Sequence, residues 1–141
     1  TARRSLSCDA AAGLARASRM GSTVIQRGGP RTSGDCAKAV ANSNLTKCAL
    51  FGNDPNWGRI ACAVGYSGAA FSREKMTIWL CNVPVFKNLQ PVIFDEKKLH
   101  RLLKAKVVTI DIDLGCGDHT AIAHSCDFSY DYVKINAEYH T

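Results

Sequence analysis

Residues 42–71 read NSNLTKCALFGNDPNWGRIACAVGYSGAAF and contain the strongest turn signals of the chain beside its longest apolar run. Asn and Asp side-chain oxygens cap helices, and Pro fits the first helical turn because its missing N–H needs no partner there. The run Asn53-Asp54-Pro55 therefore predicts a helix that begins near Pro55, after a shorter helix that ends at Gly52. The apolar face of the later helix is predicted to comprise Trp57, Ile60, Ala61 and Val64.

The length and composition indicate one globular domain. The chain has 141 residues, of which 46% are hydrophobic, and this is ordinary for a protein with a single core. No apolar run approaches the length that crosses a bilayer, so no membrane partner is expected.

The positive charge is concentrated at one end of the sequence. Residues 1–34 hold six arginines and one aspartate, whereas the remaining residues hold 12 basic and 11 acidic side chains. Charge confined to an Arg/Ser/Ala-rich end is more typical of a tail or an organelle transit segment than of a nucleic-acid-binding surface. We therefore expect a poorly ordered basic tail at residues 1–31, a folded domain at residues 32–141 and no nucleic-acid partner; binding of nucleic acid by the tail is the weaker alternative.

The remaining elements follow from hydrophobic spacing and cap residues. Thr32 and Asp35 resemble a capping box, and Asp95 precedes an apolar helical stripe. Residues 107–114 alternate between apolar and polar side chains, which predicts a half-buried strand that returns as a hairpin through residues 119–127. The predicted strands are residues 23–25, 76–85, 107–114 and 119–127, and further helices are predicted at residues 32–42, 96–103 and 130–134.

The cysteines indicate a reducing compartment. The chain has seven cysteines, an odd number, with no CxxC pair and no secretory leader. Such a set is typical of an intracellular protein with free thiols. The expected location is cytoplasmic for a bacterial protein and plastid or mitochondrial for a eukaryotic one.

Two internal patterns contain reactive residue types, but each has a simpler structural interpretation. Cys116, His119, His124 and Cys126 are zinc-ligand types, yet the two histidines are an odd number of residues apart and point to opposite faces of a strand. Paired-ligand knuckles are also missing, so no metal is expected. Residues 65–69 (GYSGA) superficially resemble a hydrolase nucleophile elbow, but the serine follows a helix, and a loop is the better interpretation.

The two ends of the sequence also carry polar groups of interest. Thr1 has the chemistry of an N-terminal nucleophile, but the residues after it do not support this role. The ending, residues 126–141 (CDFSYDYVKINAEYHT), is rich in polar and aromatic groups. Asn136 offers amide donors, and Thr141 offers a hydroxyl beside the α-carboxylate. Together they can hold both charged groups of an amino acid.

Two runs resemble a known family. Residues 41–68 (ANSNLTKCALFGNDPNWGRIACAVGYSG) are similar to the region of ornithine acetyltransferases, the glutamate N-acetyltransferases of arginine biosynthesis, that is centred on DPNWGRI. The ending CDFSYDYVKINAEYHT is similar to the C-terminus of that family. The resemblance covers about residues 32–141 and covers the first thirty residues poorly.

The resemblance implies the fold class α/β, an α+β sandwich of the αββα kind, of which this chain would be a partial domain. It also implies a precursor that cuts itself before a threonine, and an assembly of two α and two β pieces. That threonine takes the acetyl group from N2-acetylornithine and passes it to glutamate. No cofactor is implied, although acetyl-CoA is a donor in some members.

Few site residues carry over from the family. Asn136 and Thr141 match its substrate-contacting asparagine and terminal Ser/Thr. The nucleophilic threonine, the oxyanion-hole Thr-Gly pair and the substrate-binding lysine have no match, and a family glutamate would fall near residues 20–23 (MGST), where no acid is present. We therefore expect no catalytic residue in this chain, no activity when it is alone, and a missing α portion as its partner. The alternative is a non-catalytic remnant or interaction module of the same fold.

Overall fold

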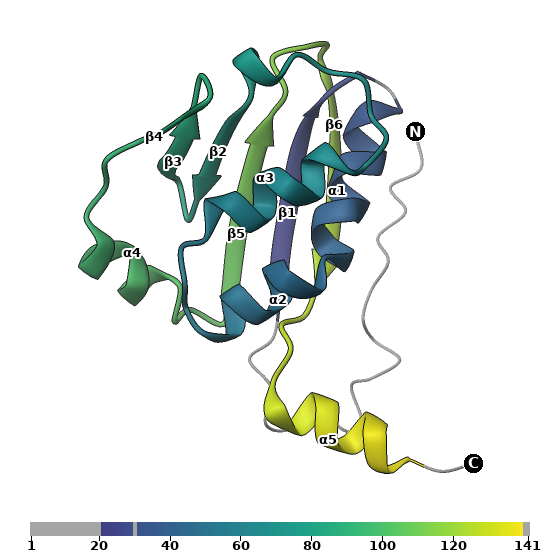
Figure 1. Cartoon of the computed structure of the whole chain (residues 1–141), viewed down its shortest axis with the longest axis vertical. Helices are drawn as coiled ribbons and strands as arrows, with labels where there is room; N and C mark the ends of the chain where they lie inside the picture. Colours follow the sequence, from purple (N-terminus) through teal and green to yellow (C-terminus); the bar gives the residue numbers. More distant parts are fainter. Residues whose placement is uncertain (1–20, 30, 140–141) are drawn as a thin grey trace.

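Six strands form one mixed sheet in the computed structural model of the chain, which describes residues 21–29 and 31–139 (Figure 1). Across the sheet the order is β4-β3-β2-β5-β1-β6, in which β1 is parallel to β5 and every other pair is antiparallel. The strands are β1 (Gly21–Gly28), β2 (Thr77–Leu80), β3 (Val83–Lys87), β4 (Gln90–Pro91), β5 (Val107–Asp113) and β6 (His119–Ser125).

Three helices cover one face of this sheet. Figure 1 shows α1, α2 and α3 in contact with one another in front of the strands, while α5 extends away from the sheet beyond the end of β6. A short 3₁₀ turn (Arg73–Lys75) precedes β2. The helices are α1 (Thr32–Asn42), α2 (Asn44–Phe51), α3 (Trp57–Gly65), α4 (Glu96–Leu102) and α5 (Tyr130–Glu138).

The core lies between the sheet and these helices. Alternation along β5 buries Ile110 and Ile112 completely or nearly so, at 0% and 1% exposure, because successive strand side chains point to opposite faces. Each such side chain contributes about 1.5–3 kcal/mol by leaving water. On the opposite face the side chains are half-buried or exposed, as for Trp79 and Ile122. The helices cover the inner face with Cys36, Val40, Ile60 and Val64.

The predicted fold class is confirmed, but the domain boundary at residues 31–32 falls too late. The strand expected at residues 23–25 is part of β1, which lies between β5 and β6 inside the sheet. The described part of the folded unit therefore begins at Gly21. Residues 1–20, which hold the rest of the expected tail, lie outside the described residues.

The hairpin expected between residues 107–114 and 119–127 is also wrong. Both strands exist, but β1 lies between them, so β5 and β6 do not pair. The connecting loop crosses the end of β1, and a Cβ added at Gly117, whose φ is 75°, would lie 2.9 Å from the carbonyl oxygen of Gly28. Local alternation identified the strands but carries no information on a partner that is distant in the sequence.

Residues 76–85 form two strands where one was predicted. The chain turns at Cys81 and Asn82, whose φ angles are 48° and 63°, and positive φ at both central residues is the requirement of a type I′ hairpin. The β2–β3 register shifts between Ile78 and Trp79, so that Trp79 pairs with Pro84, and such bulges are among the few places where a sheet accommodates proline.

Candidate functional site

The DPNWGRI run forms a rigid corner between α2 and α3. The side chain of Asn56 caps α3 by accepting a hydrogen bond from the Arg59 amide at 3.1 Å, and its own amide donates to the Asp54 carboxylate at 3.0 Å. The predicted helix therefore begins at Trp57, with Asn56 as the cap in place of Asn53 or Asp54. The guanidinium of Arg59 donates to the Leu45 carbonyl at 3.1 Å and ties α3 to α2.

Trp57 stabilises the same corner by packing. Its ring stacks on Phe86 of β3 with 4.8 Å between the centroids. Ser67, in the loop after α3, donates to the Val64 carbonyl at 2.7 Å and contacts the Cys36 thiol at 3.2 Å. Burial raises the pKa of Cys36, and the Ser67 hydrogen bond opposes this rise. The Ser67 hydroxyl is therefore used in packing contacts, which agrees with the interpretation of residues 65–69 as a loop and not as a nucleophile elbow.

The segment from Ser125 to Ser129 joins the sheet to α5. Ser125, Asp127 and Ser129 alternate as buried residues, with exposed fractions of 8%, 6% and 5%. The Ser125 hydroxyl donates to the Ala41 carbonyl at the end of α1 at 2.5 Å. Ser129 caps α5 by accepting from the Tyr132 amide at 3.0 Å. The direction of α5 is therefore set by an anchored joint.

Asn136 lies on the exposed surface of α5. Its amide donates to the Tyr132 carbonyl at 2.8 Å, within the same helix, and Asn136 is exposed like the rest of α5. Thr141, the second residue predicted to bind substrate, lies outside the described residues, as does Thr1. The Asn136 side chain is therefore exposed to solvent, as a residue predicted to contact substrate must be.

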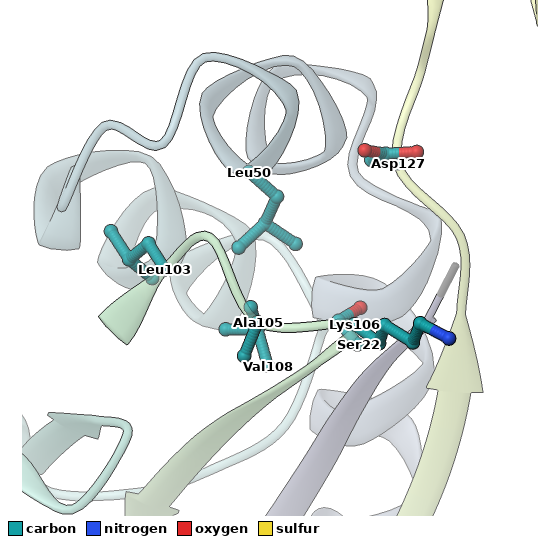
Figure 2. A pocket seen from close by; sticks show the side chains of 7 residues that line it. All are labelled: Ser22, Leu50, Leu103, Ala105, Lys106, Val108 and Asp127. Carbon is teal, nitrogen blue, oxygen red and sulfur yellow. The ribbon is translucent and has the colours of Figure 1, made fainter. Parts of the chain in front are cut away.

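A small pocket lies beside the joint. Figure 2 shows Lys106 and Asp127 on one side of it and Leu50 and Leu103 on the other. Its volume of about 20 Å³ admits roughly one water molecule, far less than the several hundred Å³ of typical ligand sites. We interpret it as part of the packing at the root of α5. The lining residues are Ser22, Leu50, Leu103, Ala105, Lys106, Val108 and Asp127.

A shallower hollow of about 230 Å³ lies on the sheet face opposite the helices, lined by Arg27, Trp79, Asn82 and Asp111. Burial raises the pKa of the Asp111 carboxyl, and the positive charge of Arg27 opposes the rise. Arg27 also lies 4.0 Å from Asp113. This cluster is not evident from the sequence because Arg27 falls within the expected tail, although the alternation of residues 107–114 places Asp111 on the polar face.

The described residues contain no group of three or more His, Cys, Asp and Glu side chains arranged to hold a metal ion. His124 contacts the Thr23 hydroxyl at 3.3 Å on the sheet, and the expected absence of a metal stays a prediction. No helix within the described ranges is long and apolar enough to span a membrane. The described cysteines are free thiols, namely Cys36, Cys48, Cys62, Cys81, Cys116 and Cys126.

The corner and the joint both lie within a region that matches a known protein family. The sequence model of the ArgJ family matches residues 17–141. This chain belongs to the ArgJ family. The resemblance drawn from the two runs is thereby confirmed.

Related ArgJ proteins are much longer than this chain. The chain is 50% identical over 110 residues to the chloroplastic arginine biosynthesis bifunctional protein ArgJ of Sorghum bicolor, an alignment that covers 74% of the chain and 24% of that protein. It is 48% identical over 105 residues to the ArgJ protein of Streptococcus mutans, covering 74% of the chain and 26% of that protein. The chain thus spans about a quarter of the length of these curated relatives.

The fold is also that of a solved ArgJ structure. The crystal structure of the arginine biosynthesis bifunctional protein ArgJ from Bacillus halodurans superposes with a TM-score of 0.84 and 36% identity. The match covers 93% of this chain and 64% of that chain. The sheet with helices on one face is therefore a part of the ArgJ fold.

Proposed function

We propose that this chain forms the C-terminal part of an enzyme that transfers an acetyl group from N2-acetylornithine to glutamate in arginine biosynthesis. The observation that carries the proposal is the exposed Asn136 amide on α5, in a chain that matches the ArgJ family over residues 17–141. The names of the relatives, which describe bifunctional proteins of arginine biosynthesis, support the same pathway.

In the proposed reaction a threonine hydroxyl attacks the acetyl carbonyl of N2-acetylornithine, and ornithine leaves with the proton on its amine. The amine of glutamate then attacks the acetyl-threonine ester, which regenerates the hydroxyl. Splitting the transfer into two covalent steps lowers each barrier, and hydrogen-bond donors stabilise each oxyanion. Acetyl-CoA is an alternative donor for the first step.

The proposed role of this chain is to bind substrate. Asn136 would donate its amide hydrogens to the substrate carboxylate, and Thr141 would contact the same amino acid. Hydrogen bonds to a charged group are roughly twice as strong as neutral ones. The sequence holds no counterpart of the Ala-Thr-Met-type segment that carries the nucleophile, so that hydroxyl would come from the α portion of the family protein or its junction, in an assembly of α and β pieces.

A second proposal, from a different class, is a non-catalytic interaction module. It is favoured by the apolar groups on the face opposite the helices, where Ile122 is 53% exposed, since exposed apolar surface next to sheet edges promotes association. Sedimentation of the purified chain as a monomer at high concentration would count against this module. The compartment proposed for either function is intracellular, because the described thiols are free and the plant relative is described as chloroplastic.

The enzyme proposal is tested with a hybrid in which residues 21–141 replace the segment of the Bacillus halodurans protein on which this chain superposes. The hybrid should transfer acetyl from N2-acetylornithine to glutamate, and the 141-residue chain alone should not. Asn136→Ala should raise the KM of the hybrid roughly 10- to 100-fold, since a hydrogen bond to a charged group is worth about 1.5–3 kcal/mol.

The matched control is Gln90→Ala, which removes another exposed amide on β4, at the sheet edge opposite β6. Its KM should stay within about twofold of the parent, as for surface substitutions in general. An inactive hybrid, or equal effects of Asn136→Ala and Gln90→Ala, would overturn the proposed role of Asn136.

A further inference from the structure

α5 lacks the packing that usually holds a helix in place. None of its nine residues, all of which lie in the described part of the chain, is buried. Isolated helices of this length are marginal in water. Within the described part of the chain, the contacts that fix α5 therefore lie at its root.

A three-layer stack at the root supplies these contacts, together with the edge-on contact of the Phe51 ring on α2 with the Tyr130 ring, whose centroids are 5.2 Å apart. The ammonium of Lys47, on α2, lies 4.9 Å from the centroid of the Phe128 ring. The other partner of Phe128 is Tyr132, on the first turn of α5, with 5.2 Å between the ring centroids and 21° between the planes. A cation over an aromatic face and an offset ring pair are both attractive arrangements.

The stack connects directly to Asn136, the residue proposed to bind substrate. The carbonyl of Tyr132 accepts the Asn136 amide hydrogen bond at 2.8 Å, one helical turn further along. The Phe128 side chain is half-buried between the buried residues Asp127 and Ser129. The series Lys47, Phe128, Tyr132 and Asn136 therefore runs from the helix layer of the core to the exposed amide.

We propose that Lys47 and Phe128 are positioning residues, which hold α5 at a fixed angle to the domain and thereby place Asn136 for substrate. This inference rests on the proposed function for its kinetic consequence only. Its structural half, that the stack immobilises α5, is independent of any activity.

The structural half is tested by NMR on the 141-residue chain. The terminal methylene protons of Lys47 should be shifted upfield by the Phe128 ring current, and Phe128→Ala should abolish this shift. Order parameters of the α5 amides should fall from near 0.85, typical of a rigid backbone, to below about 0.6. Phe128→Tyr, which keeps the ring, should restore both signals.

Lys47→Met and Lys47→Arg separate charge from bulk. Methionine keeps an apolar chain but removes the cation, so α5 should become more mobile; arginine keeps the cation and should preserve the parental order parameters. Lys38→Met is the matched control, because Lys38 is an exposed lysine on α1. Unchanged order parameters of α5 in both Phe128→Ala and Lys47→Met would overturn the inference.

The kinetic half is read in the hybrid enzyme. Lys47→Met should raise KM roughly two- to fivefold, as expected for loss of a partly exposed cation–π contact, with kcat within about twofold. A mobile α5 with unchanged KM would overturn the role in substrate placement. An inactive parental hybrid would instead overturn the proposed function, while the NMR result would still decide whether the stack holds α5.

Discussion

The corner at residues 53–60 and the α5 helix both lie within runs that resemble the family, yet they contribute to the molecule in opposite ways. The corner is bound to its surroundings by hydrogen bonds from Asn56 and Arg59 and by the stacking of Trp57. Among the described residues, α5 buries none of its side chains and meets the domain at its root, where the rings of Tyr130 and Tyr132 contact Phe51 and Phe128. Residues that resemble a family thus serve the fold in one region and are presented to solvent in the other.

The largest expected effect is the difference in the free energy of unfolding between truncating an isoleucine in the corner and truncating one in α5. Ile60 is 2% exposed and Ile135 is 41% exposed. Ile60→Ala should lower the free energy of unfolding by about 2–5 kcal/mol, because it removes buried methyl groups and leaves a cavity. Ile135→Ala should change it by no more than about 0.5 kcal/mol. Urea unfolding followed by circular dichroism measures both values, and equal losses would show that α5 is part of the cooperative core.

The helix caps give a smaller and chemically matched test. Asn56 caps α3 and Ser129 caps α5, each by accepting one backbone hydrogen bond. Asn56→Ala should cost about 1 kcal/mol of global stability. Ser129→Ala should leave the urea midpoint nearly unchanged, because α5 is outside the core, while the Cα chemical shifts of α5 move toward coil values. An equal decrease of the urea midpoint in both variants would contradict the conclusion that α5 is outside the cooperative core.

The smallest expected effect is a change in the pH dependence of stability at Asp111, a half-buried residue on β5. Burial raises the pKa of Asp111, so the folded chain binds this proton more tightly than the unfolded chain does. The contribution of this bound proton to the free energy of unfolding is fully present below the pKa of aspartate in the unfolded chain, about 3.9. This contribution is lost as the pH rises through the pKa of Asp111 in the folded chain.

Asp111→Asn removes this titration. The variant should therefore gain stability relative to the parent as pH rises from about 4 to 7, which urea midpoints at the two pH values measure. A difference that shrinks with rising pH would show that the charge of Arg27, and not burial, dominates at this site.

Local signals explain which parts of the fold were predictable from the sequence. Helix ends depend on a few neighbouring residues, so Gly52, Asp95 and Ser129 mark helix boundaries as expected. The cap expected at Thr32 is absent, because α1 begins after Arg31 without a side-chain cap. The turn at Cys81-Asn82 was missed because cysteine with positive φ is no turn signal.

Long-range pairing explains what was missed at the candidate site. Alternation identifies a strand, but it does not reveal that β1 separates β5 from β6. Composition and resemblance together pointed to Asn136, whereas the stack that holds its helix joins Lys47 to Phe128, which are far apart in the sequence. No single-residue propensity encodes such a contact, because it exists only after the sheet and α2 have formed.

The place of β1 in the sheet also governs how the chain folds during synthesis. β1 leaves the ribosome before both strands that pair with it, because α1–α4 and β2–β4 lie between β1 and β5 in the sequence and β6 comes later still. Its backbone N–H and C=O groups therefore have no strand partner while the intervening segments are synthesised, and an unpaired strand edge promotes association with other chains. Nascent chains should accordingly depend on chaperone protection until Ser125 has emerged.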